Sequence, residues 1–317
     1  MKVSIIIAVK SYNDNLEECL KACLNLNYPD FEVIVVPDWL MSYGDKRVKI
    51  LHSGPGRLPA KKRDIGAEIA TGEILAFLDD DAYPEADWLT NAVKNFSDIN
   101  IAAVGGPAVT PPNEDFYALA SGLVYESFLV SGNFRYRYTK EKKQFIDDYP
   151  SCNLLIRKDT FDRLGGFKTN FWPGEDTFLC MEIVKAGFKI VYDPDVLVYH
   201  HRRKLFSPHL KQIASYALHR GYFAKVYPQT SLRWQYFVPS IFILWIFAGS
   251  LIPKLWPVYL FFLCSYLFIV LFNAFHRSSL KLTWFVFAGI IGSHFTYGIY
   301  FIYGLTKKSL EDGGIET

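Results

Sequence analysis

The first hundred residues alternate between short apolar runs and longer stretches in which apolar residues recur at helical spacing. Continuous runs rich in β-branched residues are typical of strands buried on both faces of a sheet. Such runs occupy residues 3–9, 31–36 and 73–78, residues 47–52 predict a further strand, and helical patterns occupy residues 14–26, 59–70 and 87–96. Strands that alternate with helices predict βαβ units, and therefore an α/β fold with a mostly parallel sheet flanked by helices.

The pattern becomes less regular after residue 100. The expected elements are a strand, a helix, a basic and aromatic loop, a strand–helix–turn unit, a helix with an acidic first turn, and a short strand pair. In chain order they fall at residues 101–109, 114–131, 132–149, 150–167, 174–188 and 189–203.

The C-terminal part is apolar throughout. Residues 235–310 contain no Asp or Glu, and their only cationic residues are Lys254, Arg277, Lys281, Lys307 and Lys308. Three stretches of about the ~20 residues that cross a bilayer predict spans at residues 236–252, 256–275 and 283–304. The third contains Ser293, His294 and Thr296, so it could instead lie against protein or tilt at the interface. Residues 208–226 predict a basic amphipathic helix on the membrane surface.

These patterns predict three parts. Residues 1–205 form an α/β domain, residues 206–234 an interface helix with a linker, and residues 235–317 a transmembrane domain. Because no signal peptide is visible, we expect the α/β domain in the cytosol and the chain in the cell membrane as a multi-pass protein. Lys254 outside and Arg277 and Lys281 inside satisfy the positive-inside rule, but Lys307 and Lys308 satisfy it only if the third stretch does not span.

Composition narrows the function further. The formal net charge of +2 gives no argument for nucleic acid as a partner. The five cysteines are scattered without a CxxC pair, which favours neither a disulfide framework nor a zinc site. Cys19 and Cys23 lie four residues apart on an expected helix, a spacing typical of core packing.

Three consecutive aspartates, Asp79, Asp80 and Asp81, follow the strand at residues 73–78. In an extended strand end Asp79 and Asp81 point to one side and Asp80 to the other. Two carboxylates on one side suit Mg²⁺ or Mn²⁺, although they could also simply complement the dipole of the following helix. His200 and His201, after a short strand, could add a metal ligand or be ordinary packed residues.

Cationic residues lie just before the aspartate strand. Arg57, Lys61, Lys62 and Arg63 could hold a diphosphate together with a metal ion, or form a solvated helix face. Asp38, at the end of the second strand, could bind a nucleobase or ribose, or make an Asx-turn.

Another acidic pair, Glu175 and Asp176, begins an expected helix after Trp172. A carboxylate at a helix N-terminus is usually a cap. It could also take a proton from an acceptor hydroxyl in an inverting sugar transfer. In such a reaction the leaving group is a nucleotide diphosphate, whose growing charge a metal ion neutralises.

Together these segments resemble the family 2 glycosyltransferases, inverting enzymes of the GT-A fold that use nucleotide-diphospho-sugars. The resemblance covers residues 2–205, and the stretch "PAKKRDIGAEIATGEILAFLDDDAYPEADWL" carries most of it, with a basic pair before a helix and then a DxD metal motif. The stretches "CNLLIRKDTFDRLGGF" and "GEDTFLCMEIVKAGFKIVY" resemble the segments on the acceptor side and around the catalytic base. Departures are Ala8 in place of a proline, a single aspartate at residue 38, and Asp64 in place of an asparagine.

The resemblance implies roles for particular residues. Asp176 would be the catalytic base. The donor and nucleotide contacts would be Ala8, Lys10, Asp38, Lys61, Arg63, Asp79 and Asp80. The metal ligands would be Asp79, Asp81, His200 and His201, and the acceptor or diphosphate side would comprise Trp172, Glu175, Arg202, Arg203 and Arg220.

The sequence therefore predicts a membrane-anchored inverting glycosyltransferase that needs Mg²⁺ or Mn²⁺. It would move a sugar from a UDP- or GDP-linked donor to a lipid-linked acceptor, with a glycan hydroxyl favoured, at the cytosolic face, for cell-surface glycan or polysaccharide synthesis. A polyprenyl-phosphate glycosyltransferase, a processive polysaccharide synthase and a catalytically dead nucleotide-binding protein are the alternatives. The synthase is disfavoured because "QTSLRW" has one residue more than the QxxRW motif of such enzymes.

Overall fold

The computed structural model describes residues 1–275 and 279–310, so Arg277 lies outside the described residues. The chain forms two compact units. Met1–Pro111 and Tyr136–His201 make up the first, and Pro112–Arg135 with the chain from Arg202 onward make up the second. Residues 112–135, although they interrupt the first unit in sequence, therefore pack with the C-terminal helices.

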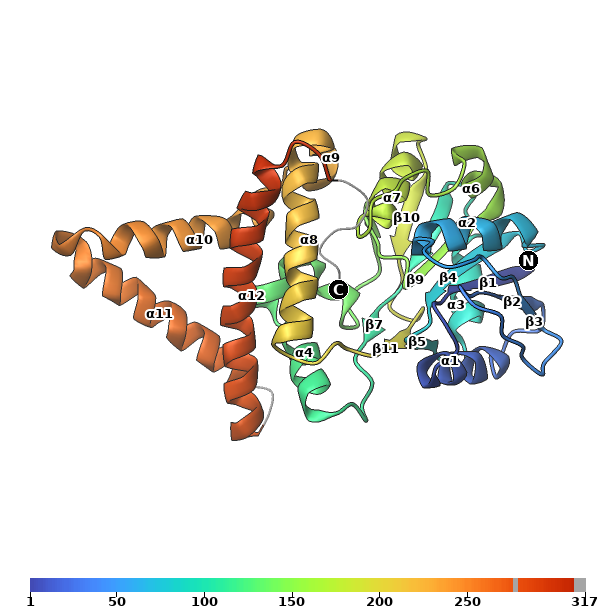
Figure 1. Cartoon of the computed structure of the whole chain (residues 1–317), viewed down its shortest axis with the longest axis horizontal. Coiled ribbons are helices and arrows are strands. Elements are labelled where there is room, and N and C mark those ends of the chain that lie inside the picture. The colour runs from blue at the N-terminus through green and yellow to red at the C-terminus, as the bar shows by residue number, and fades with distance from the viewer. Residues whose placement is uncertain (276–278, 311–317) are drawn as a thin grey trace. The chain divides into compact units, whose positions relative to one another are not determined.

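The first unit is built on one large sheet (Figure 1). In the described residues its eight strands run in the order β3 (Val48–Ile50), β2 (Phe31–Val36), β1 (Val3–Ala8), β4 (Ile74–Asp79), β9 (Asn153–Arg157), β6 (Ile101–Gly105), β10 (Lys189–Tyr192) and β8 (Gln144–Ile146). The pairs β3–β2, β2–β1, β1–β4 and β6–β10 are parallel, while β9 is antiparallel to β4 and β6, and β8 to β10. The predicted mostly parallel sheet is confirmed.

Helices cover both faces of this sheet because successive strand residues point to opposite sides. Ile5 and Ile7 of β1 belong to a core with residues of two helices, α1 (Asp14–Leu24) and α3 (Trp88–Asn95). Ile6 points to the other face, where Gly66 of α2 (Pro59–Ile69) approaches it so closely that an added Cβ would lie 2.7 Å from its side chain. Burial on both faces explains why the strands are continuous apolar runs. Cys19 and Cys23 are buried in this core, as predicted.

A second, three-stranded sheet carries part of the candidate site. It consists of β5 (Ala82–Pro84), β11 (Val198–His200) and β7 (Ala108–Val109), with β11 in the middle. The expected strand pair within residues 189–203 is therefore wrong, because β10 joins the large sheet and β11 the small one. The two strands are separated by a turn at residues 193–197, which redirects the chain between sheets.

The segment at residues 132–149 is more ordered than the expected loop. It contains the short helix η1 (Gly132–Arg137) and the edge strand β8, whose residues Gln144 and Phe145 are exposed. This strand is defined by its backbone pairing with β10. Because most of its side chains are exposed, its sequence lacks the buried pattern by which strands are recognised. The remaining helices of the first unit are α6 (Lys158–Leu164) and α7 (Glu175–Lys185).

The second unit is helical. In chain order its elements are α4 (Phe116–Glu126), α5 (Phe128–Ser131), α8 (Ser207–Val226), α9 (Pro228–Ser231), α10 (Trp234–Ser250), η2 (Pro253–Leu255), α11 (Trp256–Phe275) and α12 (Leu280–Thr306). Each of the three predicted apolar stretches is a helix. By length and hydropathy two helical segments of the described residues could cross a membrane, at residues 253–275 and 280–306, while α10 is a shorter apolar helix.

One buried amide connects the two sheets of the first unit. Asn153 donates from Nδ2 to the carbonyl oxygens of Gly106 and Val196, at 2.6 and 2.8 Å, and its Oδ1 accepts a hydrogen bond from Trp88. Gly106 precedes β7 and Val196 precedes β11, so this side chain fixes the approach to both strands of the small sheet.

We predict that Asn153→Ala lowers the free energy of unfolding by about 2–4 kcal/mol, because it leaves several buried polar groups without partners. Denaturant unfolding of the detergent-solubilised full chain, followed by tryptophan fluorescence, measures the change. Asn100→Ala, at an exposed asparagine, is the control and should have little effect. Equal stability of the two variants would contradict the structural role of Asn153.

Candidate metal and donor site

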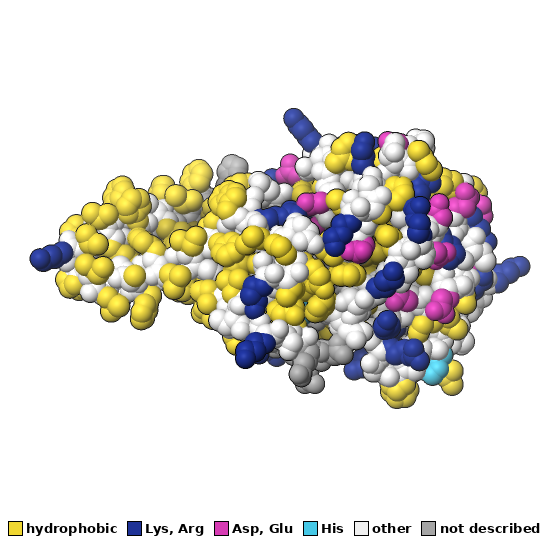
Figure 2. All heavy atoms as spheres, turned by 90° about the horizontal axis from the view of Figure 1, so that it is seen from above, with side chains coloured by type: hydrophobic (Ala, Val, Ile, Leu, Met, Phe, Trp, Pro, Cys, Tyr) yellow, Lys and Arg dark blue, Asp and Glu magenta, His cyan; other side chains and the backbone are white. Residues whose placement is uncertain are grey.

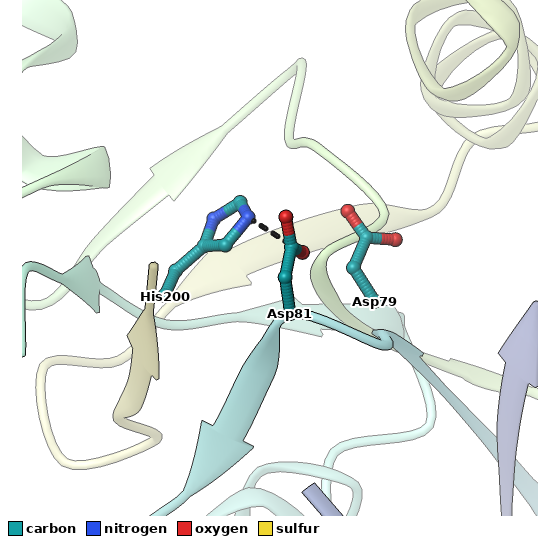
Figure 3. A group of neighbouring side chains, drawn as sticks. All are labelled: Asp79, Asp81 and His200. Atoms are coloured by element: carbon teal, nitrogen blue, oxygen red, sulfur yellow. Dashed lines mark hydrogen bonds and ion pairs between the residues drawn. The ribbon is translucent and has the colours of Figure 1, made fainter. Parts of the chain in front are cut away.

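Three potential metal ligands meet where the large and small sheets join. Single ligand atoms of Asp79, Asp81 and His200 all lie within 4.8 Å of one another. Figure 3 shows their side chains next to one another and directed toward the same space. Asp79 is the last residue of β4, Asp81 directly precedes β5, and His200 ends β11.

Strand pairing creates this arrangement. In the antiparallel pair β5–β11, His200 lies opposite Ala82, and the amide of His201 donates to the carbonyl oxygen of Asp81 at 2.9 Å. Two carboxylates and one imidazole form a donor set suited to Mn²⁺ or Mg²⁺, with oxygen ligands in the majority. The residues therefore fit a divalent cation.

His200 is linked to Asp81 through a contact of 3.1 Å between Nε2 and Oδ1. Burial opposes a charge on this imidazole, but the Asp81 carboxylate outweighs burial and raises the pKa of His200 to about 10. The nearby buried thiol of Cys152 also contributes to raising the pKa of His200. A cation at this site would take the place of the imidazole proton, since metal ligands must be deprotonated.

Asp80 and His201 have other partners. Asp80 accepts a hydrogen bond of 2.9 Å from Asn13, and burial is the main cause that raises its pKa to about 6. His201 contacts Glu18 through Nε2 at 2.7 Å. Asp80 and Asp81 lie in the turn between β4 and β5, so the alternation expected of an extended strand does not apply to them. The structure groups His200, and not His201, with the two aspartates.

A buried guanidinium joins this cluster to α7. Arg63 donates from Nη2 to Asp79 at 2.6 Å and from Nη1 to Glu175 at 3.0 Å. Burial opposes its charge, but Asp79 and Glu175 together raise the pKa of Arg63. Its side chain is only 5% exposed and its guanidinium carbon lies 5.8 Å from the centre of the Phe167 ring. The expected nucleotide contact of Arg63 stays a prediction, and the contacts observed are with protein carboxylates.

The two acidic residues at the start of α7 lie in different environments. Glu175 is buried beside Arg63, and burial, followed by the charge of Asp176, raises its pKa to about 7. Asp176 is partly exposed and accepts hydrogen bonds from the backbone amides of Thr177 and Ser151, at 2.7 and 3.3 Å. Trp172, which precedes the pair, is also partly exposed. Of the two carboxylates, Asp176 is therefore the more accessible to a substrate.

The nucleotide side predicted from sequence centres on Asp38. Its carboxylate is buried and pairs with Lys62, whose Nζ also donates to the carbonyl oxygen of Val9 at 2.8 Å. Lys61 and Lys10 are exposed, and Lys10 accepts the backbone hydrogen bond of Asp38. The parallel register places Ala8 beside both Val36 and Asp79, so the ends of β1, β2 and β4 share one edge.

Sequence reasoning passed over Cys152, and it named Lys62 as a possible diphosphate contact without predicting its pairing with Asp38. The orientation of Lys62 toward the sheet could have been found from helix periodicity, because it lies four residues before Gly66, which faces the sheet. Cys152 gave no such signal. It lies next to Asn153, which pairs with Leu78 across the antiparallel strands, and that register is not visible in the sequence.

The three arginines expected on the acceptor side belong to the second unit. Arg202 donates its backbone amide to Glu114 and places its guanidinium carbon 5.8 Å from the centre of the Tyr125 ring. Arg220 contacts Ser231 and lies over Tyr236, and Arg203 is exposed. Their roles toward substrate stay predictions.

Comparison with known proteins identifies the family. Residues 4–165, about half of the chain, match Glycosyl transferase family 2. The chain belongs to this family and is a glycosyltransferase.

Among its relatives is glycosyltransferase AglE of Haloferax volcanii, 27% identical over 215 residues, which are 63% of this chain and 67% of AglE. The glucosyl-dolichyl phosphate glucuronosyltransferase of the same organism is 26% identical over 226 residues, with 65% and 70% covered. A solved mannosyltransferase, PcManGT from Pyrobaculum calidifontis in complex with GDP-Man and Mn²⁺, aligns with a TM-score of 0.56 over 96% of this chain and 85% of its own, at 20% identity. This likeness shows the predicted GT-A fold.

We predict that His200→Ala weakens Mn²⁺ binding by about tenfold or more, because it removes one of three convergent ligands. His201→Ala is the matched control, since this neighbouring imidazole contacts Glu18, and it should bind Mn²⁺ almost as the unaltered protein does. Titration of free Mn²⁺ by electron paramagnetic resonance measures both. The reverse order of effects would show that the ligand is His201.

Arg63→Met should destabilise the full chain by about 3–5 kcal/mol, because it leaves Asp79 and Glu175 near each other without their shared cation. Adding Glu175→Gln to Arg63→Met should recover part of this loss, since one unpaired carboxylate is removed. Denaturant unfolding of both variants and of Glu175→Gln alone gives the coupling energy. Simple additivity of the two changes would contradict the shared ion pair.

Proposed function

We propose that this chain is a membrane-associated inverting glycosyltransferase that moves a sugar from a nucleotide-diphospho-sugar to a hydroxyl group of a lipid-linked glycan at the cytosolic face. The observation that carries this proposal is the pairing of a cation site, Asp79, Asp81 and His200, with a partly exposed carboxylate, Asp176. Arg63 and Glu175 connect the two. We further propose that the first unit is the catalytic domain.

The donor diphosphate binds next to the ends of β1, β2 and β4 in this proposal. Asp79, Asp81 and His200 hold a divalent cation there, which when bound neutralises the charge that develops on the departing nucleotide diphosphate. Mn²⁺ is favoured over Mg²⁺ because the site includes an imidazole beside its two carboxylates. PcManGT, which was solved with Mn²⁺ and GDP-Man, supports this choice and a nucleotide-diphospho-sugar donor, which we propose is UDP- or GDP-linked.

Asp176 acts as the base. The acceptor hydroxyl attacks the anomeric carbon from the face opposite the diphosphate, its proton passes to a carboxylate oxygen of Asp176, and the bond between the sugar and the diphosphate breaks. Two backbone amides hold the Asp176 carboxylate in place. Glu175, bonded to Arg63, supports the position of the helix end.

A lipid-linked acceptor is supported by the relatives and by the apolar helices. The Haloferax volcanii glucuronosyltransferase is named for a glucosyl-dolichyl phosphate acceptor, and two helical segments of this chain are long and apolar enough to cross a membrane. A product of this kind would serve cell-surface glycan or polysaccharide synthesis. A polyprenyl-phosphate acceptor is already ionised and would need no base, so the role of Asp176 separates the two acceptor classes.

The test uses the detergent-purified full chain with a panel of UDP- and GDP-sugars, a lipid extract, and Mn²⁺, Mg²⁺ or EDTA. We predict metal-dependent release of one nucleotide, and a loss of about 10²–10⁴-fold in kcat for Asp176→Asn. Asp159→Asn, which alters the exposed first-turn aspartate of α6, is the control and should leave kcat unchanged.

Activity that EDTA does not reduce would contradict the metal-dependent mechanism. Full activity of Asp176→Asn would instead favour a phosphate acceptor. Metal-dependent nucleotide binding without turnover for any donor would favour the catalytically dead alternative.

A further inference from the structure

The hairpin formed by α10 and α11 differs from α12 in how much of its surface is covered by protein. In the most apolar stretch of the segment that contains α11, 6% of the residues are buried within the structure. In the corresponding stretch of α12, 33% are buried. Large side chains such as Ile241, Phe247, Phe261 and Phe268 are more than half exposed along the hairpin. Figure 2 shows this part of the surface as almost entirely hydrophobic, with a single dark blue side chain at its tip. Lys254, in the turn η2, is the cation of that turn.

Helix α12 lies along α8 instead. His209 of α8 contacts Ser293 of α12 at 3.0 Å, and Lys225 near the end of α8 donates to the carbonyl oxygen of Lys307 just after α12. The backbones come very close at two glycines: an added Cβ at Gly221 or at Gly304 would lie 2.1 Å from a carbonyl oxygen of the other helix. The two helices therefore run side by side in the same direction from residue 293 to the end of α12.

Helix α12 also closes the open end of the hairpin. Its residue Gly298 accepts a hydrogen bond from Ser240 near the start of α10, while Leu282 and Val286 pack with Ala274 at the end of α11. At the other end α10 and α11 meet each other, with Gly249 against the ring of Tyr259. In Figure 1 the three helices form a triangle that has the hairpin turn at its apex and α12, with α8 beside it, as its base.

Because of this triangle, the hairpin and α12 cannot both run along the membrane normal. If α12 crossed the bilayer, α8 would cross with it. Lys211 and Gln212 of α8, two and three residues after His209, would then lie at the depth of Ser293, near the middle of α12. Lys211 is exposed, so its charge would face the hydrocarbon, which is strongly unfavourable. The hairpin, which meets α12 between Leu282 and Gly298, would meanwhile lie in the membrane plane within the hydrocarbon, and Lys254 at its turn would place a second charge there.

The orientation in which the hairpin crosses the bilayer and α12 does not cross it keeps Lys211 out of the hydrocarbon and places the apolar hairpin within it. With the hairpin along the membrane normal, the 17 residues of α10 and the 20 of α11 have lengths in the range that spans a bilayer, and Lys254 reaches the far headgroups. The α8–α12 pair then lies at the near surface, where its lysines meet anionic headgroups. Trp234 and Trp284, both more than half exposed, fall at the same level, where tryptophan is enriched.

We infer that the α10–α11 hairpin is the inserted element of this chain, and that α12 lies with α8 in the headgroup layer of an anionic phospholipid bilayer without crossing it. The described part of the chain then crosses the membrane twice, so residues 1–233 and 307–310 lie on one side and Lys254 on the other. Lys281, Lys307 and Lys308 then share one side, which removes the conflict with the positive-inside rule that three spans create. The inference rests on the membrane association in the proposed function and is independent of the reaction.

Site-directed thiol labelling tests it. Cys264 is the exposed cysteine and is first replaced by serine, and the four other cysteines are buried. Single cysteines are then introduced at exposed lysines, as Lys46→Cys in the first unit, Lys254→Cys in the turn, and Lys281→Cys and Lys308→Cys at the two ends of α12. Each full-length variant is reconstituted into vesicles of phosphatidylcholine and phosphatidylglycerol. A membrane-impermeant maleimide is added before or after detergent.

The expected result is that positions 46, 281 and 308 are labelled in intact vesicles to the same fraction, and that position 254 is labelled to the complementary fraction. Labelling of position 308 that follows 254 instead of 281 would show that α12 crosses and would overturn the inference. Complete labelling of all four positions in intact vesicles, or failure of the protein to float with the vesicles, would exclude insertion of the hairpin. Nucleotide-sugar turnover by the same variants is measured separately, so a failure of the proposed reaction is distinguishable from a failure of the topology.

Discussion

The buried ion pairs of Arg63 are the contacts on which the candidate site depends. One guanidinium binds Asp79 at the end of β4 and Glu175 at the start of α7, two segments almost a hundred residues apart in the chain. Glu175 is buried, so its charge is stable there only if a cation lies beside it. The same contact ties the start of α7, where Asp176 lies, to the end of β4.

Adjacent carboxylates in this protein differ in their burial and in their hydrogen-bond partners. Glu175 is buried and bonded to Arg63, while Asp176, one residue later, is partly exposed and held by backbone amides. Likewise Asp80 turns toward Asn13 while its neighbours face His200. The residue types do not distinguish the two members of each pair. Their contacts distinguish them.

Local patterns in the sequence predicted the class of the fold and most of its elements, but not the edge strand β8. The apolar runs of β1, β2 and β4 and the aspartates after β4 follow from periodicity, which is a property of neighbouring residues. Contacts set by strand register were out of reach. Nothing local indicates that the imidazole of His200 contacts the Asp81 carboxylate while that of His201 contacts Glu18, because this depends on the pairing of β11 with β5. The choice of Lys62 over Lys61 was accessible in principle, from the face of α2 that meets the sheet.

The hydrogen bonds of the Asn153 amide affect how the candidate site opens in local fluctuations. Asp79 belongs to the large sheet, whereas His200 is carried by a three-stranded sheet that Asn153 ties down through Gly106 and Val196. Small sheets with few ladder bonds are the parts of a domain that open first in local fluctuations. One such opening would withdraw the imidazole while leaving Asp79 in place. A cation bound by Asp79 and His200 would link the two sheets. Occupancy of the site would therefore stabilise β5, β7 and β11 against local opening.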